Sequence, residues 1–210
     1  IRVLIFGRYF PSVFRALIKK DKRKPYYLSS TCALAGENFA IVASDTRMSQ
    51  MEINIITRDA EKVHVLNDSV ILATSGFYGD VLQLKRVLQS RLHKYRFDYR
   101  TDMSCDLMAE LLARNLYYRR FFPYYTGAIL AGIDENGKGA VFSYDPIGCV
   151  ERITYAATGA AEPMMIPFFD CQDAFRTAAE REISTGDKIH LVIAEAGKPI
   201  QQMHLPLRED

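Results

Sequence analysis

Apolar residues in this chain occur in short runs that are separated by turn residues, beginning near residue 31. The runs at 31–34 and 39–44 flank a Gly-Glu-Asn turn, and those at 62–66 and 70–75 flank an Asn-Asp turn. Short runs joined by such turns are typical of β-hairpins. Two hairpins in succession predict an antiparallel sheet.

The apolar period becomes helical after residue 76. One stripe follows Asp80, which we expect to cap the helix, and a second follows Ser104. The stripes consist of Val81, Leu84, Leu88, Leu92 and Tyr95, and then of Leu107, Met108, Leu111 and Leu112. Such stripes usually pack against a core, so the pattern predicts two helices before Pro123.

The second half of the chain repeats this order of strands and helices. The predicted elements are strands at 126–133, 140–144 and 149–155, a helical stretch at 160–182 that is interrupted near Cys171-Gln172-Asp173, and a closing hairpin at 188–194 and 200–205. Each sheet needs cover on both faces. The order therefore predicts an α+β fold in which two antiparallel sheets pack face to face with helices outside.

The composition limits the classes of protein that fit. With 210 residues, of which 49% are hydrophobic and 25% charged, the chain can form one substantial core. No apolar run approaches the roughly 18 residues that a membrane-spanning helix needs. The four cysteines and four histidines lack the spacing of metal ligands. We therefore expect a soluble protein of a reducing compartment, with no metal and no cofactor.

The first 26 residues differ from the rest in charge. They contain eight basic residues and one acidic residue, a net charge of +7; since the whole chain carries +2, the remainder carries −5. Phe10, Phe14, Leu17 and Ile18 recur at helical spacing, which predicts a short basic amphipathic helix. We interpret 1–27 as an extension and 28–210 as the domain. The extension could be flexible or contact another subunit, target the chain or bind a membrane surface, or bind nucleic acid, which the acidic remainder disfavours.

Several motifs then follow one another along the chain. They are Ala-Gly-Glu-Asn-Phe-Ala-Ile-Val-Ala-Ser-Asp-Thr-Arg at 35–47, Thr-Ser-Gly-Phe-Tyr-Gly-Asp at 74–80, Arg-Arg-Phe-Phe-Pro-Tyr-Tyr at 119–125, Tyr-Asp-Pro-Ile-Gly at 144–148 and Thr-Gly-Asp at 185–187. In this order they resemble the motifs of proteasome beta subunits. The third and fourth resemble one non-catalytic member in particular, at the sixth beta position of the ring.

This resemblance covers about residues 31–210. It implies a four-layer sandwich of two antiparallel sheets between helices, and assembly with other alpha and beta subunits in stacked heptameric rings. It also implies a part in ubiquitin-dependent protein degradation in the cytoplasm and nucleus, without nucleic acid or membrane as a partner. In active members a threonine, freed by self-cleavage after glycine, attacks the peptide carbonyl with its own amine as the base.

Two supporting positions of the family's site are present. Asp45 occupies the position of the family's aspartate before Thr-Arg, and Lys62 matches its lysine if one extra residue is allowed between them. In active members such groups tune the site electrostatically. The alternative is a structural ion pair in which Asp45 lies beside Arg47 and Lys62.

The nucleophile position departs from the family's pattern. Eighteen residues before Arg47 stands Ser29 rather than threonine, and the nearby Thr31 follows Ser30 where processing requires glycine. The other degenerate positions are Ala160 in place of serine, Glu182 in place of aspartate and Thr185 in place of serine. Together these changes predict a chain with no catalytic residue.

Three hypotheses follow for the function. The leading one is a non-catalytic structural beta subunit of the 20S proteasome core. The second is an active threonine- or serine-type peptidase, if cleavage before Ser29, Ser30 or Thr31 exposes an amine. The third is a membrane or nucleic-acid adaptor that uses the basic residues 1–26.

One more departure concerns the helices of the second half. The chain passes directly from Gln172 to Asp173, where the family has the end of one helix, a loop and the first turns of the next. We therefore expect a shortened second helix pair. Losing those turns should remove cover from one sheet face.

Overall fold

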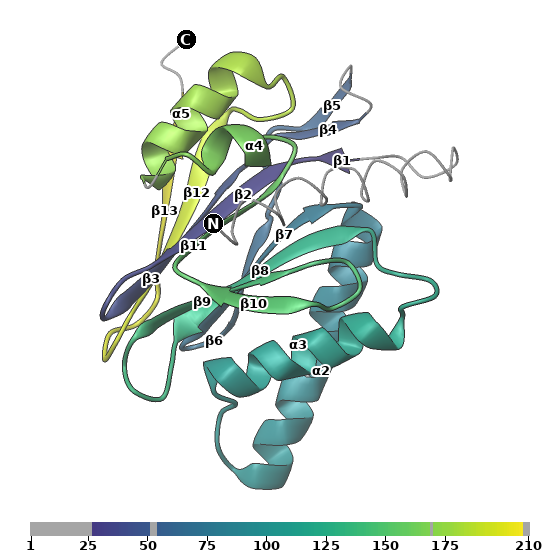
Figure 1. Ribbon diagram of the computed structural model, residues 1–210, viewed down its shortest axis with the longest axis vertical. Coiled ribbons are helices and arrows are strands. Elements are labelled where there is room, and N and C mark those ends of the chain that lie inside the picture. The colour runs from purple at the N-terminus through teal and green to yellow at the C-terminus, as the bar shows by residue number, and fades with distance from the viewer. Residues whose placement is uncertain (1–26, 51–53, 169, 208–210) are drawn as a thin grey trace.

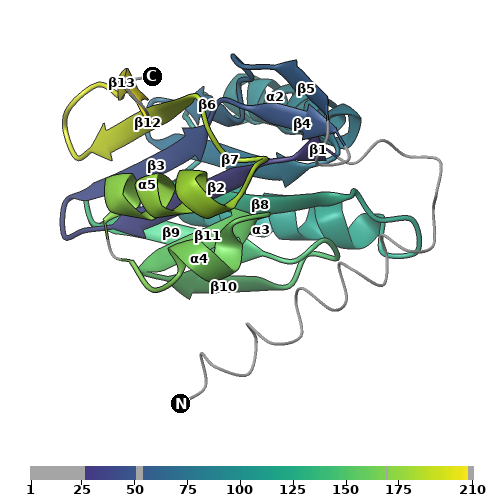
Figure 2. The same cartoon turned by 90° about the horizontal axis from the view of Figure 1, so that it is seen from above.

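The computed structural model describes residues 27–50, 54–168 and 170–207, so the predicted basic extension at 1–26 lies outside the described residues. Two five-stranded sheets pack face to face, and helices cover the outer face of each (Figure 1, Figure 2). The four-layer α+β sandwich predicted from the sequence is confirmed.

The strands form three sheets in the described part of the chain. Sheet I has the order β10 (Val150–Ile153), β9 (Gly139–Tyr144), β8 (Thr126–Ile133), β7 (Val70–Gly76) and β6 (Val63–Asn67). Sheet II has the order β11 (Tyr155–Gly159), β2 (Ser30–Ala35), β3 (Phe39–Asp45), β12 (Lys188–Glu195) and β13 (Gln201–Pro206). A small sheet has the order β1 (Tyr27–Leu28), β4 (Met48–Gln50) and β5 (Asn54–Thr57). The pairings are antiparallel, as the hairpins predict.

Small and aliphatic side chains fill the space between sheets I and II. Successive side chains of a strand leave opposite faces, so alternate residues point into this layer. The buried cluster consists of Ala33, Ala40, Val42, Val63, Ile71, Ala73, Ile129, Ala131, Val141, Ala156, Val192 and Ala194. Their neighbours along the strands are often buried beneath the helices instead. Burial on both faces explains why the runs are almost continuously apolar.

The helices α2 (Tyr78–Tyr99) and α3 (Cys105–Tyr118) cover sheet I. The predicted apolar stripe of α2 is buried in a cluster with α3 and with residues of β7, β8 and β9. The prediction that Asp80 caps this helix is wrong, because α2 already begins at Tyr78. Its carboxylate accepts a hydrogen bond from the Tyr125 N–H at 2.9 Å instead, which ties the first turn of α2 to the start of β8.

The predicted single strand at 149–155 is wrong. The structure divides it at Thr154 into β10, which pairs with β9 in sheet I, and β11, which pairs with β2 in sheet II. The strands β1, β4 and β5 were also missed. A pattern of apolar residues records burial, and it cannot show that the chain leaves one sheet for the other.

The helices α4 (Glu162–Met165) and α5 (Cys171–Arg181) cover sheet II. The interruption lies between Met165 and Cys171 rather than at 171–173. The reason is that the Asp170 carboxylate caps α5, accepting the N–H groups of Gln172 at 2.7 Å and Asp173 at 3.1 Å. With four and eleven residues, the pair is short, as predicted.

Burial of Glu162 in α4 gives a prediction for the pH dependence of stability. Burial raises the pKa of its carboxyl from 4.5 to about 7. The folded protein therefore keeps a proton that the unfolded chain releases, and this group's contribution to stability falls as the pH rises from about 4.5 to about 7. We expect Glu162→Gln to raise the free energy of unfolding at pH 8 by about 1–2 kcal/mol, allowing for solvent screening, and to leave it nearly unchanged at pH 4.5. Urea unfolding at both pH values measures this, and equal effects at the two would contradict it.

Candidate functional site

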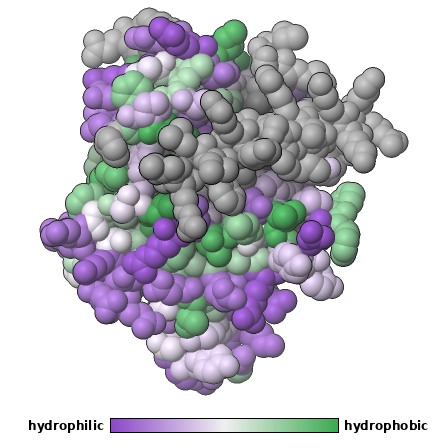
Figure 3. All heavy atoms as spheres, viewed as in Figure 1, coloured by the Kyte–Doolittle hydropathy of each residue, from purple (hydrophilic) through white to green (hydrophobic). Residues whose placement is uncertain are grey.

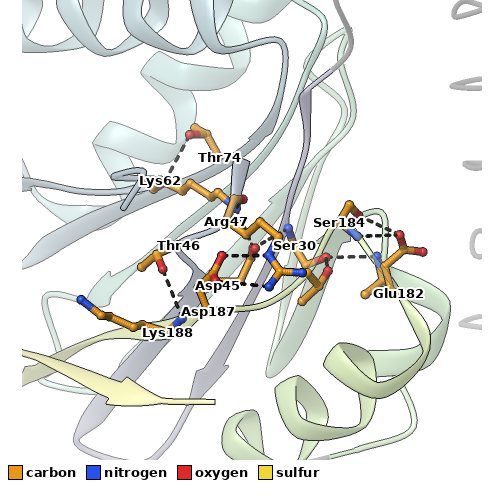
Figure 4. A network of polar contacts seen from close by, with 12 residues as sticks. Ser30, Asp45, Thr46, Arg47, Lys62, Thr74, Glu182, Ser184, Asp187 and Lys188 are labelled. Atoms are coloured by element: carbon orange, nitrogen blue, oxygen red, sulfur yellow. Dashed lines mark hydrogen bonds and ion pairs between the residues drawn. The ribbon is translucent and has the colours of Figure 1, made fainter. Parts of the chain in front are cut away.

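A buried ion pair joins the two supporting residues predicted from the sequence. Asp45 ends β3, Lys62 precedes β6, and the Lys62 Nζ lies 2.7 Å from the Asp45 Oδ1 (Figure 4). The side chains are 0% and 3% exposed, respectively. The Ser30 N–H donates to the same carboxylate oxygen at 3.0 Å, and Lys62 also donates to the carbonyl oxygen of Arg47. The pair thus links β2 and β3 of sheet II to the start of β6 in sheet I.

Burial governs the protonation of this pair. It raises the pKa of the Asp45 carboxyl and lowers the pKa of the Lys62 ammonium, because each charged form loses its water, while the attraction between the two opposes both shifts. The Asp45 Oδ2 has no hydrogen-bond partner among the described residues. The Asp45 carboxylate is therefore stabilised by Lys62 and by the backbone N–H groups of Ser30 and Gly186.

The three candidate nucleophiles occupy different environments. Ser29 lies beside Lys62 in the lining of a small pocket. The Ser30 hydroxyl lies 2.8 Å from the Thr185 Oγ1 and accepts the Ala161 N–H at 3.1 Å. Thr31 is fully buried, and its hydroxyl has no partner among the described residues. Only Ser29 occupies the place that a nucleophile next to Lys62 would need.

The pocket at Ser29 is nearly filled. Its lining consists of Ser29, Met48, Lys62, Thr74, Ser75, Gly76, Tyr78 and Val81. Its cavity volume is about 10 Å³, at the lower limit of the space that one water molecule needs. A peptide side chain does not fit this space.

The backbone before Ser29 continues without a break into β1. Tyr27 pairs with Gln50 and Leu28 with Ser49 in the small sheet. As long as the Leu28–Ser29 bond is intact, the nitrogen of Ser29 is an amide, and an amide nitrogen cannot act as the base that a hydroxyl nucleophile requires.

The degenerate positions surround the same place, but they form structural contacts. Ala160 has no hydroxyl, and its N–H donates to the carbonyl oxygen of Ser29 at 3.0 Å. Thr185 contacts the Ser30 hydroxyl, as described above. Glu182 directly follows α5, and its carboxylate accepts the Ser184 N–H at 3.2 Å and the Ser184 hydroxyl at 2.8 Å (Figure 4). Thr185 thus contacts a segment far away in the sequence, whereas Glu182 contacts only the turn that follows it.

A second ion-pair cluster was not predicted. Arg47 pairs with Asp187 at 2.8 Å, and Arg58 reaches the same carboxylate at 2.8 Å. Burial alone would raise the pKa of Asp187, but the hydrogen bonds and charges of the two guanidinium groups lower it. The interpretation that placed Arg47 beside Asp45 in one ion pair is thus corrected, since Arg47 binds Asp187 while Asp45 binds Lys62. The Thr-Gly-Asp motif at 185–187 was the only sequence signal discussed above that includes Asp187. In the structure Asp187 directly follows Gly186 and adopts a positive φ of 69°.

Other kinds of site are not seen in the part of the chain that the structure describes. No group of three or more histidine, cysteine or acidic residues there could hold a metal ion. None of the helices in that part is long and apolar enough to cross a membrane.

Comparison with known proteins identifies the family. A family model described as "Proteasome subunit" matches residues 28–194, which is most of the chain. The chain belongs to the proteasome subunit family. The resemblance noted in the sequence is thereby confirmed.

Three relatives of this proteasome subunit carry the same name. It is 69% identical to Proteasome subunit beta type-1 of Caenorhabditis elegans, over 92% of this chain and 85% of the relative. It is 39% identical to Proteasome subunit beta type-1 of Danio rerio, over 91% of each chain. The protein of the same name from Arabidopsis thaliana is 39% identical, over 86% of this chain and 93% of the relative. The similarity to one particular beta subunit is therefore confirmed.

The alignments also show that this proteasome subunit lacks residues within the matched region. The nematode alignment spans 220 positions but uses 92% of 210 residues, about 193, so about 27 positions have no residue in this chain. The zebrafish alignment spans 217 positions and uses 91%, about 191, which leaves about 26. Such a deficit agrees with the short pair α4 and α5.

Proposed function

We propose that this proteasome subunit is a non-catalytic, structural beta subunit of the 20S core particle. It assembles with other proteasome subunits, in stacked heptameric rings of alpha and beta subunits, and contributes to the chamber in which ubiquitin-tagged proteins are degraded. Neither nucleic acid nor a membrane is part of this role. We also propose that it resides in the cytoplasm and nucleus, which fluorescence of a tagged chain would test.

The residue identity at the nucleophile position, Ser29 after Leu28 instead of threonine after glycine, is the observation that carries the non-catalytic assignment. A serine hydroxyl is a weak nucleophile until a base takes its proton, and the nearest basic group is Lys62. The ammonium of Lys62 already donates to the Asp45 carboxylate and to the Arg47 carbonyl oxygen. A pocket of about 10 Å³ leaves no room for a substrate side chain next to them. The contact of Lys62 with Asp45 instead joins sheet I to sheet II.

Substitution of Ser29 tests this assignment. In core particles that contain Ser29→Ala in place of the natural chain, we expect every peptidase activity to stay within about 20% of its value in unsubstituted particles, because no step of catalysis uses this hydroxyl. Fluorogenic peptides for each activity measure the outcome, and native gels of the particles serve as the assembly control. Loss of one activity by 100-fold or more, in particles that assemble normally, would refute the assignment.

The peptidase alternative makes a different prediction about the amino terminus. A working nucleophile at Ser29 requires cleavage of the Leu28–Ser29 bond, which would separate β1 from β2. Amino-terminal sequencing of the chain from purified particles distinguishes the two. An intact bond supports the structural role, whereas a terminus at Ser29 supports the peptidase.

Assembly needs its own test, because the second helix pair is short. We expect an affinity-tagged copy of this chain to copurify with the alpha and beta subunits of the core particle. Mass spectrometry of the purified particle would give the stoichiometry. Particles that consistently lack the chain, although it is expressed, would contradict a structural role.

A further inference from the structure

The outer face of sheet II carries an apolar patch that the short helices leave partly open. We define the open patch as Leu34, Ile41, Leu191, Ile193 and Met203. The register places Leu34 opposite Ile41, Ile41 opposite Ile193, and Leu191 opposite Met203, so the patch crosses four neighbouring strands. Met203 is 36% exposed and the other four are half-buried.

The register also shows that this patch lies on the helix side of the sheet. Residues two apart on a strand share a face, and Cys32 and Ala43 are two positions from Leu34 and Ile41. Both are fully buried in the cluster with α4 and α5. Leu34, Ile41 and Leu191 pack against the edge of this cluster but stay half-buried, and Ile193 and Met203 are not part of it. The helices therefore cover this face only in part.

The length of the helices explains where the cover stops. The eleven residues of α5 span about 16 Å at 1.5 Å per residue, whereas the eight residues of β12 span about 26 Å. α5 cannot cover the full length of the strands beneath it.

The helices beside the patch are acidic. Residues 162–182 contain five acidic residues, Glu162, Asp170, Asp173, Glu180 and Glu182, and two basic ones, Arg176 and Arg181, a formal net charge of −3. This segment holds more than half of the −5 charge of residues 27–210. Figure 3 shows hydrophilic and hydrophobic side chains side by side at the end of the molecule that carries these helices.

We propose that the basic segment at residues 1–26 of this chain docks on the open patch and replaces the missing helical cover. The segment carries a charge of +7, opposite in sign to the helices that border the patch. Its Phe10, Phe14, Leu17 and Ile18 recur at the i, i+4, i+7 and i+8 spacing of an amphipathic helix that binds in an apolar groove. Both the apolar and the charged chemistry of the two surfaces are therefore complementary.

The dimensions agree with this arrangement. A helix from Phe10 to Ile18 is about 12 Å long, and four strands span about 14 Å between the first and the last. Seven residues separate Tyr27 from Leu34, so they lie at most about 25 Å apart. Residues 19–26 can span about 27 Å when extended, so the segment can return to the patch.

Photo-cross-linking in the full-length chain tests the proposal directly. A benzophenone amino acid replaces Ile41 in one variant and Ile193 in another, and a matched control carries it at Phe97 of α2, which is 70% exposed on the other helix layer. We expect both patch variants to cross-link within the same molecule to peptides from residues 10–18. The yield should be at least fivefold above that of the control and should fall by at least twofold in 0.5 M NaCl, since salt screens the charges. Cross-links only between molecules, or equal yields in all three variants, would overturn the proposal.

A second measurement covers the case in which the probe disturbs the patch. Deletion of residues 1–26, or Phe14→Asp with Leu17→Asp in the full chain, should raise the fluorescence of a bound hydrophobic dye at least threefold while the circular dichroism of the folded domain stays the same. Unchanged dye binding in both variants would overturn the proposal. So would tight binding of the full chain to anionic vesicles or RNA through residues 1–26, with the dye still bound. None of these readouts depends on peptidase activity, so they stand apart from the proposed function.

Discussion

Asp45→Asn is expected to lower the free energy of unfolding by about 3–5 kcal/mol. The change leaves the Lys62 ammonium, 3% exposed, without its carboxylate, and a buried charge that loses its partner is costly because water cannot replace the partner. Asparagine keeps the shape of the side chain and can still accept the Ser30 N–H, so the loss reports on charge rather than packing. Urea unfolding at pH 7 measures the effect.

Two controls make this result specific. Asp45→Asn together with Lys62→Met should recover most of the loss, since no unpaired charge remains. Glu195→Gln removes an ion pair of nearly equal length, 2.8 Å to Lys198, but Lys198 is 58% exposed, so the cost should stay below about 1 kcal/mol. If Asp45→Asn cost no more than Glu195→Gln, the buried pair would not stabilise the fold.

The second large effect is expected from Gly159→Ala at the end of β11. A Cβ at this position would lie 1.9 Å from the carbonyl oxygen of Ser29. The backbone also has φ of 108°, which residues other than glycine rarely adopt. Because the obstacle is backbone in a paired strand, it cannot turn aside. We expect a loss of about 3–5 kcal/mol in the free energy of unfolding, from the steric clash and the strained φ together. Thermal and urea unfolding of the soluble variant measure it.

Gly197→Ala is the matched control for this variant. Gly197 also has a positive φ, 76°, but a Cβ there would meet nothing within 4 Å. Its substitution should therefore cost only the backbone strain, about 1 kcal/mol. Equal losses at the two glycines would show that the approach of β11 to Ser29 is looser than described.

These expected results give the degenerate site a physical meaning. The contacts of Asp45, Lys62, Ser30 and Thr185 join β2, β3, the start of sheet I and the segment after α5. In an active member of the family, by the resemblance described above, the corresponding groups serve a free amino-terminal threonine. Here the same positions stabilise the junction between the sheets. Under the proposed non-catalytic role, the polar cluster persists for its contribution to the fold.

Much of the fold could be predicted from the sequence, because strands that are buried on both faces appear as short, almost continuous apolar runs. The paired runs around β2 and β3 and around β6 and β7, and the stripe of α2, all reflect side chains removed from water. The strand predicted at 149–155 failed for a related reason. No glycine or proline stands between Cys149 and Thr158 to mark a turn, so the sequence does not reveal that β10 and β11 pair in different sheets.

The candidate site was predictable only in part. The motifs identified Asp45 and Lys62, and the structure confirms that they meet. The partner of Arg47 was assigned wrongly, because Asp187 lies 140 residues away and only the folded chain brings the two together. For the three candidate nucleophiles, sequence spacing left Ser29, Ser30 and Thr31 open. The folded chain separates them, since of the three only Ser29 lines the pocket that Lys62 also lines.

The sequence by itself determined the family, the two-sheet architecture and the absence of glycine before the nucleophile position, because each depends on residue identity and local order alone. The tertiary structure decided the rest. It decided that the Ser29 pocket is nearly filled, that Asp45 binds Lys62 rather than Arg47, and that the helices on sheet II leave Leu34 and Ile41 only half-buried. These features depend on distances between segments far apart in the chain, which are set by packing and cannot be read from any single stretch of residues.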